Sequence, residues 1–433
     1  MPYQKCFRRD SQFILQILIR LVLFRTNLFV TVALNPVAYN VNQIDSIIMK
    51  EAELIASMKA LAPLLEANAA ESERLRKPVD SVMKAIEDTQ AYRYFVPKKY
   101  GGFEFSLVGF MDIGVTLGGA DISTAWVTTF CMEHNWLIGL FNKEAQERIF
   151  GSQPYIIAPG ALAPRGKATA VDGGYRLTGR WEWGTGVMHA DWVLVGALTA
   201  HAGPPEMCMY ALPIADVRIK DTWHMSGMVG TGSNDIIVED AFVPACLRQN
   251  LSDMRAGGSP GAEYHQTSTF RMPMLPVLGL TAAAPAVGCA KRTVERFRER
   301  LQERTVYGTQ DKQSEKALAQ SRLAHLTVRV KTLETTLKQI AQDVTLWGES
   351  GDVCPDSERA ELRVRIGHVV REARNIVREV VEVSGAHAHN LANPFGRALR
   401  DLETLSCHTV FDLDIATESY GRLLLGLPSN TPL

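Results

Sequence analysis

Apolar residues in the first third of the chain recur at helical spacing. From Met49 to about residue 90 they return every three or four positions, as an amphipathic helix requires, and Pro78 stands where a new helix begins. Residues 105–121 and 123–141 are apolar on nearly every side, which is typical of buried helices. We therefore predict a helical domain over residues 49–155.

Near Pro159 the period changes from helical to alternating. Short runs rich in β-branched and aromatic residues follow, and Gly, Pro, Asp and Asn divide them. Examples are GGYRLTG, ADWVLVGAL and DIIVEDAFVP. This pattern predicts a central β domain over residues 156–262, built as a barrel or a sandwich.

Two long apolar stripes dominate the last third of the chain. In both stripes the apolar residues alternate steps of four and three, as in the packing seam of a long-helix bundle. We predict a C-terminal four-helix bundle over residues 263–433, and an α+β multi-domain fold overall. The stripes consist of Ala319, Leu323, Leu326, Val330, Leu333, Leu337, Ile340, Val344 and Trp347, and then of Leu362, Ile366, Val369, Ala373, Ile376, Val380 and Val383.

Residues 1–48 differ in character from the rest. A basic N-terminus precedes an apolar stretch over residues 11–39, as in a signal peptide or membrane anchor, but Arg20 and Arg25 interrupt that stretch. An arginine at the centre of a membrane span costs about 2.5–3.5 kcal/mol on insertion scales, and no small-residue cleavage site stands out. We interpret this segment as an extension, spurious or disordered, and we expect the functional chain to begin at Met49.

Composition narrows the classes of function. The chain has 433 residues and a formal net charge of −1 at pH 7, so it shows no basic excess for binding nucleic acid. Its seven cysteines are odd in number and never stand in CxxC spacing. That usage argues against a disulfide framework and against a zinc site, and it suits a cytoplasmic protein. We therefore predict no metal.

Four stretches, in a fixed order, carry a resemblance to a known family. They are VPKKYGGFE, GRWEWGTGVMHADWVLVGA, GMVGTGSNDIIVEDAFVP, and NPFGRALRD followed by His408. With the order of helical, strand and helical regions, they resemble the acyl-CoA dehydrogenase superfamily from Met49 nearly to the C-terminus. The more specific resemblance is to its two-component flavin-dependent monooxygenases, such as the oxygenase components of 4-hydroxyphenylacetate and secosteroid-phenol hydroxylases.

The resemblance implies a monooxygenase that hydroxylates a phenolic or other small aromatic substrate through a flavin C4a-hydroperoxide. Reduced flavin, as FMN or FAD, and molecular oxygen are the implied cosubstrates. Such chemistry needs a dry cavity, a donor beside flavin N5 and a base near the substrate hydroxyl group. No GxGxxG follows a predicted strand, so a separate flavin reductase is the expected source of reduced flavin. A homotetramer is also implied, because flavin sites in this family use residues of neighbouring subunits.

Three residues take catalytic roles by the resemblance. Thr185 stands where relatives place a serine beside flavin N5, and threonine keeps the hydroxyl donor. His134 lies eight residues after Trp126, so both lie on roughly one helix face, like the substrate-contacting Trp and His of phenol-hydroxylating relatives. His408 occupies the position of a histidine near the flavin oxygen site. The alternatives are a strand-end threonine, a core histidine and a surface histidine.

Four more residues, with Thr185, are implied to hold the flavin. Arg271 resembles the arginine near flavin N1 and the C2 carbonyl group, where it would stabilise negative charge. Arg397 and Arg400 belong to a helix whose family counterpart approaches the flavin phosphate. Trp183 is expected to wall the pocket. Ordinary salt bridges and β-domain packing are the alternatives for these residues.

Two other functions remain open. An acyl-CoA dehydrogenase with bound FAD needs a carboxylate base over its acyl thioester. The Tyr-Glu-Gly-Thr stretch that often carries this base is missing here, and Glu418 lacks its context, although some dehydrogenases place the base on an earlier helix. The second alternative is a non-catalytic partner subunit with a flavin-binding fold. The presence of Thr185, His134 and His408 favours a catalytic role.

Overall fold

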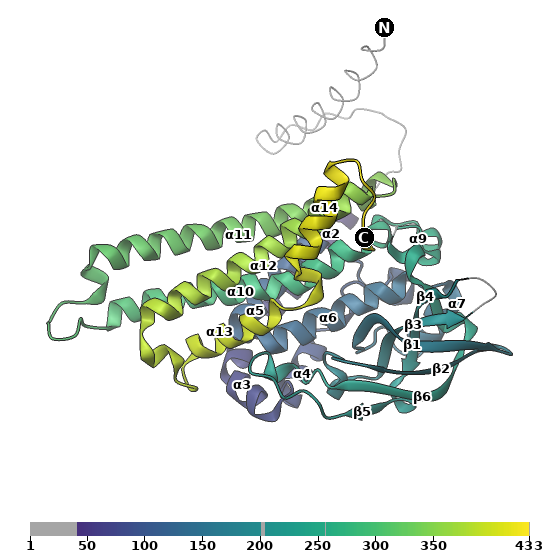
Figure 1. Cartoon of the computed structure of the whole chain (residues 1–433), viewed down its shortest axis with the longest axis horizontal. Helices are drawn as coiled ribbons and strands as arrows, with labels where there is room; N and C mark the ends of the chain where they lie inside the picture. The colour runs from purple at the N-terminus through teal and green to yellow at the C-terminus, as the bar shows by residue number, and fades with distance from the viewer. Residues whose placement is uncertain (1–40, 201–203, 256, 433) are drawn as a thin grey trace, which may run out of the picture. The chain divides into compact units, whose positions relative to one another are not determined.

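The structure, a computed structural model, describes residues 41–200, 204–255 and 257–432, with side chains from Glu51 onward (Figure 1). The predicted extension over residues 1–48 lies almost wholly outside these residues; helix α2 (Val41–Ala60) includes its last few positions. The described residues from Glu51 onward form one compact unit, which contains all the elements that follow α2.

Helices fill the first part of this unit. Polar side chains cap three of them: Ser106, Asp121 and Asn142 each accept a hydrogen bond from a backbone N–H of the first turn. Two of these helices, α5 and α6, are buried along nearly their whole length, as their continuous apolar sequence predicts. The helices are α3 (Ala62–Leu75), α4 (Asp80–Asp88), α5 (Leu107–Ala120), α6 (Ile122–Gly139) and α7 (Lys143–Phe150).

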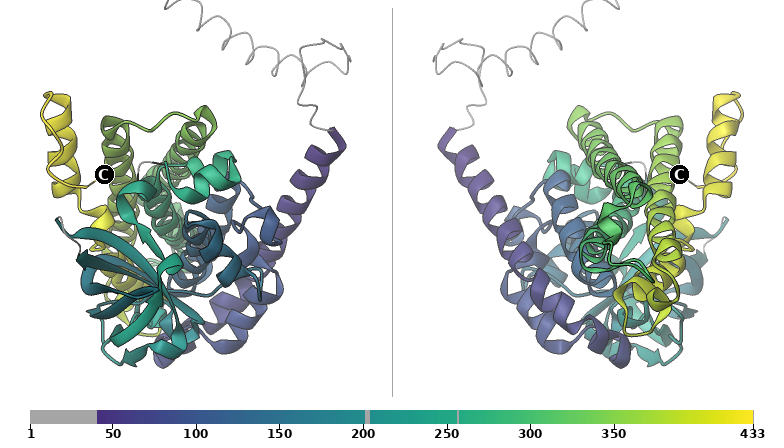
Figure 2. Two further views of the ribbon diagram at one scale, coloured as in Figure 1. Left: turned by 90° about the vertical axis from the view of Figure 1, so that its right-hand side faces the viewer. Right: turned by 90° about the vertical axis from the view of Figure 1, so that its left-hand side faces the viewer.

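Seven strands form one sheet, in the order β5-β6-β2-β1-β3-β4-β7. Strands β1 and β3 run parallel, and the other neighbouring strands are antiparallel. In the views of Figures 1 and 2 the sheet lies beside α6, on the side away from the long C-terminal helices. The strands are β1 (Gly160–Val171), β2 (Gly174–Trp181), β3 (Trp192–Ala200), β4 (Glu206–Pro213), β5 (Arg218–Lys220), β6 (Asp235–Pro244) and β7 (Arg248–Asn250).

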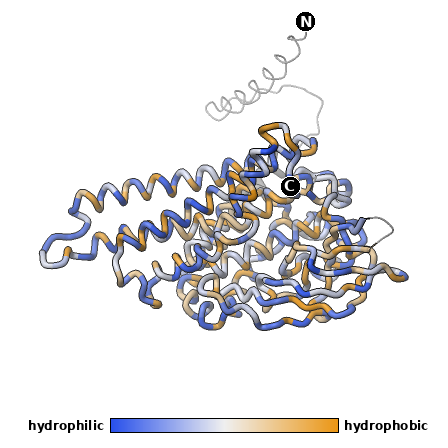
Figure 3. Tube along the Cα trace, viewed as in Figure 1, coloured by the Kyte–Doolittle hydropathy of each residue, from blue (hydrophilic) through white to orange (hydrophobic). Residues whose placement is uncertain are grey.

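Long helices form the last part of the unit. The predicted stripes are buried along much of α11 and α12, where apolar and polar residues alternate in Figure 3. The predicted order of helices, strands and helices is thus confirmed, although the predicted boundary at residue 262 falls inside α9. These helices are α8 (Leu251–Arg255), α9 (Pro260–His265), α10 (Met274–Glu303), α11 (Ala317–Ser350), α12 (Asp356–Ser384), α13 (Pro394–Leu405) and α14 (Leu413–Leu424).

Helix α10 is the central helix of this bundle. Among the residues described, it is the one helix long and apolar enough to cross a membrane by length and composition. However, 89% of its most apolar window is buried inside the protein, where it packs against α5, α11 and α12. Its composition is therefore that of a core helix.

Glycines let α5 and α10 approach at backbone distance. A Cβ atom added at Gly288 would lie 1.9 Å from the carbonyl oxygen of Val115, and one at Gly118 would lie 2.3 Å from that of Pro285. Side chains at these positions would force the two helices apart. The fit of α5 against α10 therefore depends on glycine.

We expect Gly288→Ala to lower the free energy of unfolding by about 1–3 kcal/mol, because the added methyl group overpacks this contact. Gly421→Ala in α14 is the matched control: nothing lies within 4 Å of the added Cβ atom, so higher helix propensity should raise stability by up to about 1 kcal/mol. Urea unfolding of both variants measures the difference. Equal stability of the two variants would contradict this account of the helix contact.

Candidate active site

One face of α6 carries a row of aromatic side chains. Trp126, Phe130 and His134 follow each other at four-residue spacing, so they point to the same side of the helix. The rings of Trp126 and Phe130 are 4.6 Å apart, and those of Phe130 and His134 are 5.6 Å apart. The predicted pair Trp126 and His134 therefore belongs to one continuous aromatic surface.

Two residues from distant parts of the chain meet this surface. Thr185, in the loop after β2, accepts a hydrogen bond from Nε1 of Trp126 over 3.4 Å. The ring of His408, just before a short 3-10 helix (Thr409–Phe411), lies 5.7 Å from that of Trp126 and 6.4 Å from that of Phe130. The structure thus brings together His134, Thr185 and His408, the three predicted catalytic residues.

The hydrogen bonds of His134 define its tautomer. Its Nδ1 lies 2.6 Å from the carbonyl oxygen of Ala158, and a carbonyl oxygen only accepts, so Nδ1 carries the proton. Burial lowers the pKa of His134 to about 4, so the ring is neutral at pH 7. Its Nε2 is then a hydrogen-bond acceptor. This atom lies close to Gly160, where an added Cβ atom would be only 2.7 Å from it.

His408 has the opposite tautomer. The backbone N–H of Val410 donates to Nδ1 of His408 over 3.3 Å, which leaves the proton on Nε2. Burial lowers the pKa of His408 to about 4, although its side chain keeps accessible surface. The cluster therefore offers one acceptor, Nε2 of His134, and one donor, Nε2–H of His408.

Thr185 stands at the end of a chain of hydroxyl groups. Its Oγ1 lies 3.2 Å from Oγ of Ser233, which lies 2.8 Å from Oγ1 of Thr231. Thr231 in turn donates to the carbonyl oxygen of Met228 over 2.9 Å. Ser233 and Thr231 were not predicted as site residues, although both lie in the GTGSN stretch of the family motif.

Trp183 is an exposed residue of the predicted set. Its side chain is 54% exposed, its φ is +71°, and its ring meets that of Trp223 edge-on at 6.3 Å. An exposed indole on a backbone in the left-handed region is unusual, and such strain is more common at ligand sites. The role of Trp183 as a wall of the flavin pocket stays a prediction.

The predicted arginines are not part of the cluster. Arg400 forms an ion pair with Glu73 at 2.5 Å and donates to the carbonyl oxygen of Ser226. Arg397, also on α13, lies near buried carboxyl groups whose pKa it lowers against the larger effect of burial. Arg271 ends a 3-10 helix (Ser268–Arg271) and lies beside Gly351, at the end of α11. Their roles in holding flavin stay predictions.

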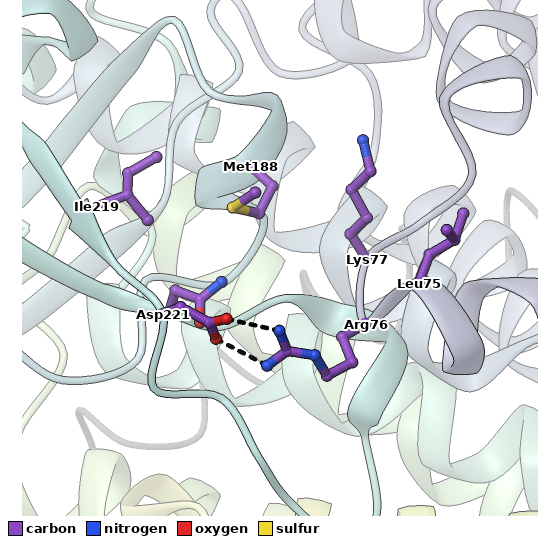
Figure 4. Close-up of a pocket in the computed structure, with 7 residues that line it drawn as sticks. Leu75, Arg76, Lys77, Met188, Ile219 and Asp221 are labelled. Atoms are coloured by element: carbon purple, nitrogen blue, oxygen red, sulfur yellow. Dashed lines mark hydrogen bonds and ion pairs between the residues drawn. The ribbon is translucent and has the colours of Figure 1, made fainter.

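A separate pocket of about 240 Å³ contains none of the predicted residues. Figure 4 shows Arg76 and Asp221 facing each other there, joined by two hydrogen bonds of 2.7 Å. The charged groups of Arg76 and Asp221 in this pocket are therefore already paired with each other. Its lining consists of Leu75, Arg76, Lys77, Met188, Ile219, Asp221 and Asn234. Among the described side chains, no group of three or more His, Cys, Asp or Glu is placed to hold a metal ion.

Comparison with known proteins places the chain in a family. Residues 280–413 match the C-terminal domain of acyl-CoA dehydrogenases. The chain is 33% identical to a pigment production hydroxylase of Rhodococcus sp., over 88% of this chain and 98% of the relative. It is 31% identical to HsaA, the oxygenase subunit of a flavin-dependent monooxygenase of Rhodococcus jostii, over 86% of this chain and 98% of HsaA.

Solved structures agree with this placement. The crystal structure of 3-HSA hydroxylase from Rhodococcus sp. matches with a TM-score of 0.83 at 30% identity, over 88% of this chain and 98% of that one. XiaF from Streptomyces sp., solved with FADH2 and glycerol, matches with a TM-score of 0.84 at 25% identity, over 90% of this chain and 99% of that one.

Fold and site therefore define a flavin-dependent oxidoreductase with the acyl-CoA dehydrogenase fold. Within that fold the chain belongs to the family of flavin-dependent monooxygenases, as an oxygenase component that uses reduced flavin and molecular oxygen. The prediction of a monooxygenase is confirmed over that of an acyl-CoA dehydrogenase.

Asp401 holds the turn at the far end of the hydroxyl chain. Its Oδ1 accepts from the backbone N–H of Met228 over 2.6 Å. Burial raises the pKa of Asp401 to about 7, against the opposing effects of Met228 and Arg397. Between about pH 4 and pH 7 the folded chain thus binds a proton that the unfolded chain releases. This group's contribution to stability is present at low pH and is lost as the pH rises through about 7.

We expect Asp401→Asn to remove that pH dependence, because the amide keeps the acceptor for Met228 but does not ionise. Raising the pH from about 5 to about 8 should lower the free energy of unfolding of the unmodified chain by roughly 2–3 kcal/mol more than that of the variant. Denaturant unfolding at both pH values measures the difference. Glu403→Gln is the control: Glu403 lies on the same helix as Asp401, and the change removes a surface ion pair with Arg378 of α12. A variant with the unmodified chain's pH dependence would refute the assignment.

Proposed function

We propose that the chain hydroxylates a small phenolic compound, with reduced flavin supplied by a separate reductase. The observation that carries this proposal is that Trp126 and Phe130 join three polar side chains: Thr185 and His408 meet Trp126, and His134 meets Phe130. Relatives named for phenolic substrates support it: p-hydroxyphenylacetate 3-hydroxylase of Acinetobacter baumannii and resorcinol hydroxylase of Rhizobium sp., each 27% identical to this chain.

The geometry gives each side chain a task. Nε2 of His134 accepts the proton of the phenol, whose ordinary pKa near 10 keeps it un-ionised at neutral pH. The hydroxyl group of Thr185 and Nε2–H of His408 both lie beside Trp126, and as hydrogen-bond donors they suit the reacting edge of a flavin. Bound reduced flavin supplies the electrons that activate dioxygen. Trp126 and Phe130 keep water away from this region.

We further propose a homotetramer. Arg271 lies beside Gly351 rather than beside Thr185. Its predicted contact with flavin N1 is therefore best explained if Arg271 reaches the flavin of a neighbouring copy of the chain. Helix α11 supports this proposal with large apolar side chains that stand exposed in the single chain, among them Leu318 at 62% and Val328 at 61%. A cytoplasmic location stays a prediction.

We expect the purified chain to insert one atom of ¹⁸O₂ into a phenol when reduced FMN or FAD is supplied. Mass spectrometry of the product, with hydrogen peroxide measured in parallel, tests this. His134→Asn should lower product formation by about 10²–10⁴-fold and release peroxide instead, because the proton acceptor is lost. His189→Asn is the matched control, since His189 is another largely buried histidine, bonded to the carbonyl oxygen of Pro78 outside the cluster.

Two results would contradict the proposal. One is a product without ¹⁸O from every phenol tried. The other is reduction of the bound flavin by an acyl-CoA, which is the reaction of a dehydrogenase.

A further inference from the structure

Glu133 is a buried carboxyl group that the site described above does not use. It lies on α6, its side chain is 0% exposed, and neither of its carboxyl oxygens has a hydrogen-bond partner. Among the buried unpartnered polar atoms of the described residues, no others belong to a carboxyl group. An ionised carboxylate without a partner in an apolar interior costs many kcal/mol, so Glu133 is protonated there. A protonated carboxyl group is a hydrogen-bond donor.

Helix geometry places Glu133 at the site. It follows Trp126 by seven residues, which is close to two turns, so both share one face of α6. Its Oε2 lies 3.6 Å from Nε2 of His134, the acceptor atom of that ring. The half-buried ring of Phe130 lies between His134 and the accessible His408, at 5.6 and 6.4 Å.

We propose that Glu133 and His134 together bind the hydroxyl group of the aromatic substrate, Glu133 as donor and His134 as acceptor. This inference rests on the proposed function and specifies the substrate contact within it. The separation of 3.6 Å between Oε2 and Nε2 lets one oxygen atom lie at hydrogen-bond distance, about 2.6–3.2 Å, from both atoms.

The pair explains how a phenol ionises in an apolar surrounding. The proton leaves the phenol oxygen and bonds to Nε2 of His134, so the imidazole becomes imidazolium and the phenol becomes phenolate. The adjoining phenolate charge offsets the burial that lowers the pKa of the ring to about 4 when no substrate is bound. Glu133 keeps its own proton and continues to donate to the phenolate oxygen. The net charge of the site does not change. A carboxylic acid kept neutral by an apolar site is a known donor to developing oxyanions.

The arrangement also defines a chemical class of substrate. A hydroxyl group both donates and accepts, so it satisfies both side chains. A ring N–H, as in indole, only donates, so it satisfies Nε2 of His134 and leaves the O–H of Glu133 without a partner. The site therefore selects hydroxylated aromatic compounds over N–H heteroaromatic ones.

A chromophoric phenol tests this without flavin. 4-Nitrophenol is titrated into the full-length, flavin-free chain, and absorbance reports both its binding and its ionisation while bound. We expect the chain to lower the pKa of the bound phenol relative to the free one. Glu133→Leu keeps a side chain of similar length without a donor, so 4-nitrophenol should bind about tenfold more weakly and its bound pKa should rise. Indole binding should not weaken.

Glu133→Gln provides the conservative comparison. Its amide N–H group restores a donor, so we expect phenol affinity within about threefold of the unmodified chain. Melting curves of both variants establish that they fold. Unchanged binding and ionisation of the phenol in a folded Glu133→Leu variant would overturn the inference, as would equal weakening of phenol and indole binding.

His134→Asn separates this inference from the proposed function. Loss of phenol ionisation in His134→Asn but not in Glu133→Leu means that only the role of Glu133 is wrong. Unchanged phenol binding in both variants, or no binding of 4-nitrophenol to the unmodified chain, contradicts phenol hydroxylation at this site as well.

Discussion

The burial of α6 between the bundle and the sheet is the constraint on which the site depends. Hydrogen bonds from its side chains fix the chain that leads into β1: Asn135 both donates to and accepts from the backbone of Ile156, and His134 donates to Ala158. Trp136 donates to the carbonyl oxygen of Thr269, ahead of α10. One helix thus sets the position of the sheet and of the bundle, and its remaining face carries the site.

The two histidines show how backbone contacts assign chemistry. Both are neutral at pH 7, yet Ala158 accepts from Nδ1 of His134 while Val410 donates to Nδ1 of His408. Identical side chains therefore present opposite groups to the cluster, an acceptor and a donor. Neither ring needs an extra proton or a charged partner to present its acceptor or donor. This suits a region that must exclude water.

Helical and strand periods predicted the order of elements because burial follows local spacing. The resemblance assigned roles to His134, Thr185 and His408. The structure joins these residues through Trp126 and Phe130, and their roles stay predictions. Phe130 was missed, although its four-residue spacing from Trp126 and His134 is visible in the sequence.

Other features depend on contacts that no local pattern encodes. Ser233 matters only because the turn before β6 reaches the loop after β2. The role of Glu133 depends on its carboxyl group having no hydrogen-bond partner among the described residues, and the sequence does not show this. Its one sequence signal is a lone acidic residue in the apolar segment 123–141. Arg271 was assigned to the flavin by resemblance, and a single chain cannot test a contact that a neighbouring copy would complete.

A chain of hydroxyl groups links the turn at Met228 to Thr185. The carbonyl oxygen of Met228 only accepts, so Thr231 must donate to it, and the oxygen of Thr231 is then best satisfied by Ser233. With Ser233 committed in this way, its oxygen accepts the proton of Thr185, while Thr185 accepts from Trp126. For Thr185 to donate to a flavin instead, its hydroxyl group must turn away from Ser233.

That turn costs little, because Oγ1 of Thr185 is 3.2 Å from Ser233 and this is the weakest link between hydroxyl groups in the chain. The shorter links beyond it, and the bond of Asp401 to Met228, hold the turn in place while Thr185 changes partner. Without a ligand, the hydroxyl group of Thr185 donates to Ser233; with a better acceptor present, it can donate to that acceptor instead. In neither state is its proton buried without a hydrogen-bond partner. Helix α13, through Asp401, therefore contributes to the site without touching it.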